Sequence, residues 1–106
     1  MATGILGNAD LSAGANTTLY TCPADTFTIA TVSVVNRGTS AIQVRLAVCD
    51  TGTPNNSEYL EYEATILPNN VLERTGIAMQ ANKLLVVRSS ASSVNALAMG
   101  IETSAV

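Results

Sequence analysis

The chain has 106 residues, of which 47% are hydrophobic, 12% charged and 4% aromatic. This length suits one domain, and the charged fraction is about half the usual ~25% of soluble domains. Five basic and eight acidic residues give a net charge of −3, which excludes a nucleic-acid binder that follows phosphates, while the high hydrophobicity excludes a disordered chain.

The first segment, residues 1–15, is rich in Gly, Ala and Asn and predicts an N-terminal arm that is either loose or ordered by a neighbour. It has no basic region followed by an apolar one, so we expect no secretory signal. No stretch approaches the roughly 20 apolar residues of a membrane span. We therefore expect synthesis in the cytoplasm, where cysteines stay reduced at first.

Residues 16–106 predict one all-β domain, because short apolar runs alternate with polar residues and are separated by Gly, Pro, Asn and Ser clusters. Seven strands are predicted, at 17–22, 27–35, 41–49, 58–66, 71–77, 84–87 and 94–102. Their spacing, with no long helix, favours a single β-sandwich of immunoglobulin-like or jelly-roll kind over a barrel.

The strands 27–35 and 41–49 are expected to pair as a hairpin, because the loop 36–40 between them contains Asn and Gly. The second of these strands alternates regularly between apolar and polar residues, which is typical of a half-buried strand.

The apolar phase of strand 27–35 changes along its length. Phe27 and Ile29 occupy odd positions, whereas Val32 and Val34 occupy even ones. A bulge near Ala30 and Thr31 would explain this change, as would a strand covered on both faces, and both explanations stay open.

The last two strands have different patterns. The unbroken apolar run 84–87 predicts a strand buried on both faces. In 94–102, Leu97, Met99 and Ile101 share one face with Asn95, while the other face is rich in Ala and Gly. The small residues predict close packing against a neighbour.

The composition excludes several kinds of catalytic and metal site. There is no histidine, which excludes Ser-His-Asp and Cys-His triads and removes the commonest zinc ligand. Cys22 and Cys49 lack a CxxC spacing and fit two free buried residues better than a disulfide, although the distance along the chain leaves a disulfide open. We expect no metal and no cofactor.

The acidic residues cluster between positions 58 and 73. Glu61 and Glu63 are expected on one strand face, as a solvated surface paired with arginines, with calcium binding and glycoside hydrolysis as lesser alternatives. Arg74 is expected to form a structural or inter-subunit ion pair, and Arg37 lies in a turn or contact loop. The candidate contact residues are Arg37, Arg45, Glu61, Glu63, Glu73 and Arg74.

Several short motifs carry a resemblance to a known group of proteins. They are YTCPA (20–24), VVNRG (34–38), VRLA (44–47), EYLEY (58–62), LERTG (72–76) and GIE (100–102). From about Gly4 to Glu102 the chain resembles the small virion structural proteins of tailed bacteriophages, notably those of cyanobacteria. The resemblance implies a particle component without enzymatic activity, and it supplies no catalytic residues.

The expected function is therefore a capsid decoration or cement protein, an oligomer, taken as a trimer, that bridges capsid subunits. Low charge and apolar residues on both strand faces are typical of a chain that buries surface in an assembly. The expected partners are the major capsid protein, other virion proteins and further copies, without nucleic acid or membrane. The alternatives are a tail, baseplate or fibre adaptor and, in another class, a carbohydrate-binding adhesin module.

Overall fold

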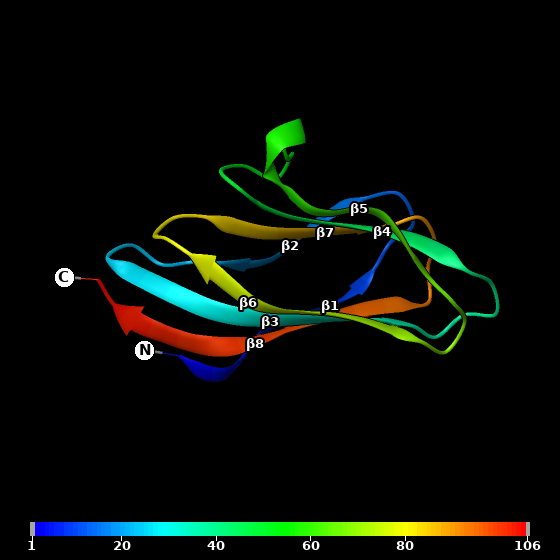
Figure 1. The fold of residues 1–106 in the computed structure, drawn as a ribbon, viewed down its shortest axis with the longest axis horizontal. Coiled ribbons are helices and arrows are strands. Elements are labelled where there is room, and N and C mark those ends of the chain that lie inside the picture. Colours follow the sequence, from blue (N-terminus) through cyan, green and yellow to red (C-terminus); the bar gives the residue numbers. More distant parts are fainter. Residues whose placement is uncertain (1, 106) are drawn as a thin grey trace.

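Figure 1 shows two β-sheets packed face to face in the computed structural model, which describes residues 2–105. The strands are β1 (Thr3–Leu11), β2 (Asn16–Thr21), β3 (Thr26–Asn36), β4 (Ile42–Cys49), β5 (Tyr59–Ile66), β6 (Val71–Met79), β7 (Leu84–Ser89) and β8 (Val94–Ser104), and the 3₁₀ helix η1 covers Asn56–Glu58. Sheet A has the order β1-β8-β3-β6 and sheet B the order β2-β7-β4-β5. The all-β sandwich predicted from the sequence is confirmed.

The strand pairs are nested within one another. β1 pairs with β8, β2 with β7, β3 with β6 and β4 with β5, all antiparallel. The chain is thus one long hairpin rolled over on itself, and the pairs β3–β8 and β4–β7 complete the two sheets. Of the two sandwich types that the sequence left open, this order is that of a jelly roll.

The predicted hairpin between 27–35 and 41–49 is wrong, because β3 lies in sheet A and β4 in sheet B. The loop 36–40 arches across the sandwich. The buried Asn36 amide holds this arch: its Nδ2 donates to the carbonyls of Ser40 (2.8 Å) and Ile66 (3.0 Å), and its Oδ1 accepts from the N–H of Gly38 (2.9 Å). A loop containing Gly suits an arch as well as a hairpin.

The eighth strand, β1, lies in the segment 1–15, whose order the sequence left open. Its pairing with β8 runs from Thr3 opposite Ile101 to Leu11 opposite Val94, so this part of the segment is ordered by its own chain. A Cβ atom on Gly7 would collide with the carbonyl oxygen of Leu19 in β2. The glycine therefore permits the close approach of the two sheets at this edge.

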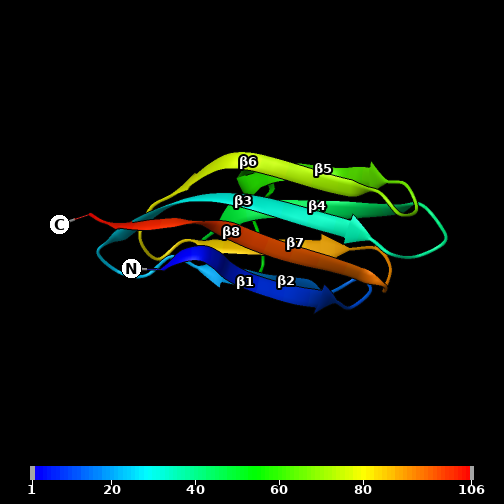
Figure 2. The same ribbon diagram turned by 90° about the horizontal axis from the view of Figure 1, so that it is seen from below.

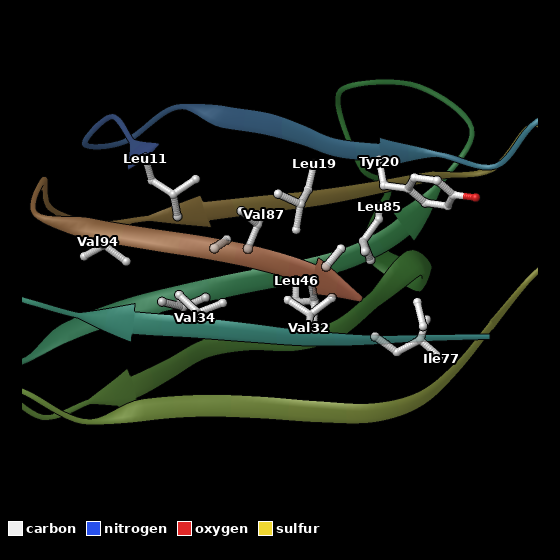
Figure 3. Packing of buried hydrophobic residues seen from close by; sticks show 14 of the residues in the cluster. Leu11, Leu19, Tyr20, Val32, Val34, Leu46, Ile77, Leu85, Val87 and Val94 are labelled. Carbon is white, nitrogen blue, oxygen red and sulfur yellow. The ribbon is translucent and has the colours of Figure 1, made fainter. Parts of the chain in front are cut away.

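The core fills the space between the sheets (Figure 3). Its buried members are Leu11, Leu19, Tyr20, Cys22, Ala30, Val32, Val34, Ile42, Val44, Leu46, Ile66, Ile77, Met79, Leu85, Val87, Val94, Ala96 and Ala98. The residues come from all eight strands, as expected when alternate positions of each strand point inward.

A second, smaller cluster lies on the outer face of sheet B. Ala47, Cys49 and Val86 are buried there, with Tyr59 and Leu84 packed against them. Because the neighbours of Val86 along β7 face the main core, the prediction that 84–87 is buried on both faces is confirmed.

The predicted close packing of the Ala and Gly face of β8 is also confirmed. Ala96 and Ala98 are buried in the core, and a Cβ atom on Gly100 would collide with the backbone of Ile29 and Ala30. Small side chains let β8 lie close to its neighbours, which places its larger residues on the opposite face.

The phase change in 27–35 arises because the outward residues Phe27 and Ile29 are apolar. Neither a bulge in this strand nor cover on both faces causes it. The even positions of β3 are buried from Thr26 to Asn36, and its pairing with β8 is unbroken, so β3 itself has no bulge. The extra residue lies in the partner strand β6, where Gly76 has a φ of +66°. Phe27 and Ile29 point outward and remain exposed, so the strand is not covered on both faces.

No helix among residues 2–105 has the length and apolarity needed to cross a membrane. The only helical element in this part of the chain is the single turn η1, capped by Asn55 and Glu58. It projects from the sheet B side of the sandwich (Figure 1).

Replacing Asn36 by Ala tests the role of the arch. The substitution leaves the Gly38 N–H and the Ser40 and Ile66 carbonyls without their partner. Only the contact to Ile66 is fully buried. Since an unsatisfied buried group costs about 1–3 kcal/mol, we expect a loss of about 1–3 kcal/mol of unfolding free energy in urea titrations. The control Asn8→Ala, at an exposed position, should stay within about 0.5 kcal/mol; equal effects would contradict this role.

Candidate functional site

The most distinctive surface is apolar and lies on the outer face of sheet A, which faces the viewer in Figure 2. We define the apolar patch as Ile5, Phe27, Ile29, Met99 and Ile101. The register places Ile29 directly opposite Ile101 and Ile5 opposite Met99, so the patch is continuous over three strands. Ile5 is 57% exposed, Ile101 55%, Ile29 47% and Phe27 40%.

The outward strand residues around the apolar patch carry no charge. The other outward strand residues in this half of sheet A, assigned from alternation and pairing, are Thr3, Thr31, Ala78 and Thr103. Outward charged side chains of these strands begin towards the opposite end of the sheet, with Asp10 of β1 and Glu73 of β6. At the near end, Asp25 lies in the turn before β3, and Glu102 of β8 is bound by Tyr20 of the other sheet. Such a surface can bury area against another molecule.

Sequence reasoning did not name this patch as a site, although two signals for it were present. The phase change in 27–35 marked Phe27 and Ile29, and the shared face in 94–102 marked Met99 and Ile101. Both signals become interpretable only when the inward face of each strand is known. The candidate residues chosen from the sequence were charged ones, and they lie elsewhere.

Two of these candidates, Glu61 and Glu63, were expected on one strand face, and this is wrong. The pairing of β4 with β5 is interrupted between Leu46 and Val44, and Glu63 has a φ of +54°. Glu63 accepts from Arg45 (3.1 Å) on the outer face of sheet B, whereas Glu61 accepts from Arg74 (2.6 Å). The bulge separates the two carboxylates.

The pair of Arg74 and Glu61 joins the two sheets. Arg74 belongs to β6 of sheet A and Glu61 to β5 of sheet B, and Arg74 also donates to the Leu60 carbonyl (3.4 Å). The contact closes one open edge of the sandwich within a single chain. As a partly exposed ion pair it contributes at most about 1 kcal/mol.

The remaining candidates lie beyond the apolar patch, Arg37 in the arch that follows β3 and Glu73 on β6. Arg37 donates to Asp10 (2.7 Å) and to Asn95 (3.0 Å), which links the arch 36–40 to β1 and β8. Glu73 accepts from the Ser33 hydroxyl (3.3 Å) on the neighbouring strand. Both residues thus have partners within the chain.

The outer face of sheet B carries a hollow of about 330 Å³ lined by Asn56, Tyr59 and Tyr62. The two tyrosine rings meet edge to face, with centroids 4.9 Å apart and planes at 76°. The guanidinium carbon of Arg45 lies 4.5 Å from the Tyr62 centroid, a cation–π contact. Two of the chain's four aromatic residues therefore gather around one concavity.

The two cysteines are free and buried. Cys22 belongs to the main core and Cys49 to the cluster on the outer face of sheet B. Burial raises the pKa of the Cys49 thiol, which keeps it protonated and poorly nucleophilic at neutral pH. The arrangement is that of two packing residues.

A polar network lies next to the apolar patch, at the end of β8. The Tyr20 hydroxyl donates to one carboxylate oxygen of Glu102 (2.5 Å), and the Ala2 N–H donates to the other (2.9 Å). The bond from Tyr20, followed by that from Ala2, holds the pKa of Glu102 below its usual value, and burial raises the pKa of Tyr20. Since Tyr20 belongs to β2, the bond connects sheet B to sheet A.

Neither a scan of protein-family models nor a search of curated proteins found a match for this chain. Among residues 2–105, no group of three or more His, Cys, Asp or Glu side chains could hold a metal ion.

The Glu102 network predicts a specific pH dependence. Because folding lowers the pKa of Glu102, its carboxylate stabilises the fold above the unfolded-state pKa of about 4.3, and this contribution disappears as the pH falls through the depressed value. Glu102→Gln should therefore lower the melting temperature more at pH 7 than at pH 2.5. Glu73→Gln, on the same sheet, is the control, and an equal loss for Glu102→Gln at both pH values would contradict the prediction.

Proposed function

We propose that the chain is a non-enzymatic structural protein of a tailed-phage virion, carried on the capsid as an oligomeric decoration or cement protein. The observation that carries this proposal is the apolar patch, four of whose residues are 40–57% exposed. In a chain with few charges, such a surface is typical of a protein that binds other proteins.

Two further arguments support the proposal. The first is the expected resemblance to small virion proteins, which rests on the short motifs of the sequence alone. The second is that capsid proteins are among the known users of the jelly roll. The second argument is an analogy of fold, which does not determine function by itself. The patch supplies the argument specific to this chain.

A protein of this kind would act by adding buried surface. Each 100 Å² of apolar surface removed from water contributes about 2.5 kcal/mol, and a lattice of many copies multiplies a small contribution per copy. The sandwich is well suited to this task, because the Asn36 arch and the Arg74–Glu61 pair join its sheets at separate places. A protein that bridges two capsid subunits in this way would resist their separation.

The proposal is tested on purified virions whose genome encodes the chain. We expect mass spectrometry to detect the protein, and cryo-electron microscopy to locate it in many symmetry-related copies on the outside of the head. A few copies at the tail or baseplate would instead support the adaptor alternative. Absence of the chain from purified particles would overturn the virion proposal.

A second candidate function, carbohydrate binding, is favoured by the tyrosine hollow. Asn56 offers an amide, and Tyr59 and Tyr62 offer aromatic surface and hydroxyls around one concavity, and lectin domains also use the jelly roll. Tyr62 is 59% exposed, so a large part of its side chain is accessible to a ligand. This combination of ring surface and hydrogen-bonding groups suits a neutral sugar.

The carbohydrate candidate predicts that a glycan array yields at least one ligand. Tyr62→Ala should weaken the binding of that ligand about tenfold, because the aromatic contact is worth about 1.4 kcal/mol. Phe27→Ala removes an exposed aromatic residue of sheet A and should leave binding unchanged. An array without signal, or equal losses in both variants, would contradict this candidate.

A further inference from the structure

We infer that a second copy of this chain binds to the apolar patch, face to face, around a two-fold axis that passes near Ile29 and Ile101. This inference deepens the proposed function and rests on it in one respect, that the patch is an assembly surface. It names the occupant of that surface and the symmetry of the contact.

The sheet edges are poorly suited to self-association. All four edge strands are irregular: β1 between Ile5 and Gly7, β2 between Thr18 and Tyr20, and β5 and β6 where their pairing with β4 and β3 is shifted. The two central pairs, β3–β8 and β4–β7, are unbroken. Because bulges disrupt the row of backbone groups that another strand would need, association must use a face.

The two outer faces differ in what covers them. On sheet B, η1 and the loop before it project outward (Figure 1), and Arg45 pairs with Glu63. Sheet A has no such cover over β1, β8 and β3 (Figure 2). Its central strands pair without interruption from Thr26 opposite Ser104 to Asn36 opposite Val94. Only sheet A therefore offers a regular and open face.

The charge distribution favours a second copy over a charged partner. A charged partner would lose solvation against the apolar patch and find no opposite charge there. A two-fold axis near Ile29 places each patch on its own equivalent, so an apolar surface meets an apolar surface. With the strands of the two copies running antiparallel, Asp10, Arg37 and Glu73 lie beyond the overlap and keep their hydration.

The available area is sufficient for a modest interface. An overlap of about seven residues along each of four strands measures roughly 23 Å by 19 Å, or about 440 Å² of flat area per copy. Two copies together bury about 880 Å² of flat area, which lies below the ~1,200 Å² of stable interfaces and in the range of weak, transient ones. We therefore expect pairing with a Kd of about micromolar, which many copies on a particle would reinforce.

Sedimentation equilibrium of the full chain tests the inference. The wild type should change from monomer to dimer as its concentration rises through the micromolar range. Ile29→Lys and Ile101→Lys should each raise the Kd at least tenfold, because each places a charge in the apolar contact. The matched control is Leu67→Lys, because Leu67 is 56% exposed in the turn between β5 and β6, and this variant should dimerise like the wild type.

A cross-linking experiment keeps the test decisive if a lysine variant does not fold. Stacked sheets lie about 10 Å apart, beyond the reach of a disulfide, so Ile29→Cys is treated with a bismaleimide of about that length. The native cysteines are buried and should not react. Covalent dimers with Ile29→Cys, and none with Leu67→Cys, support the two-fold contact.

Three results would overturn the inference: a wild type that stays monomeric at all concentrations, lysine variants that dimerise like the wild type, or a trimeric mass. A trimer would match the sequence-based expectation and exclude the two-fold contact. These outcomes are distinct from failure of the virion proposal. A monomer found in many copies on particles would reject only the dimer, whereas a dimer absent from particles would reject only the virion role.

Discussion

The buried amide of Asn36 holds the arch on which the arrangement of the strands depends. Its side chain binds the Ser40 and Ile66 carbonyls and the Gly38 N–H, while its backbone exchanges hydrogen bonds with Asn69 and Asn70. One residue thus ties the end of β3 to two of the connections that cross between the sheets at this end, those from β3 to β4 and from β5 to β6. Because the chain crosses here instead of turning back, β3 takes β6 and β8 as neighbours, and the nested pairing of the jelly roll becomes possible.

That nesting determines which residues meet on the surface. β3 and β8 are far apart in the sequence, yet their unbroken pairing brings Ile29 opposite Ile101. The inward positions of these strands are occupied by small or β-branched residues such as Ala96, Ala98 and Val32, which pack closely in the core. The larger apolar residues therefore lie on the outer face. The apolar patch and the tight core are two consequences of the same alternation.

The strand positions could be predicted from the sequence because a period of two is a local property, as Ile42 to Val48 show. Strand partners could not, since the loop 36–40 has the composition of a hairpin as well as of an arch. β1 was missed because Gly4 and Gly7 interrupt its alternation, and its order comes from β8. The separation of Glu61 from Glu63 depends on a positive φ at a non-glycine residue, which local pattern does not indicate.

All five basic residues have polar partners within the chain. Of the five basic residues, Arg37, Arg45, Arg74 and Lys83 form ion pairs within the chain, and Arg88 donates to the Gly14 carbonyl. None of these five residues lies over the apolar patch. Around the apolar patch, the outward polar side chains are the hydroxyls of Thr3, Thr31 and Thr103, which cost little to bury once they are hydrogen-bonded. A face composed in this way loses little solvation when another surface covers it, as the proposed pairing of two copies would require.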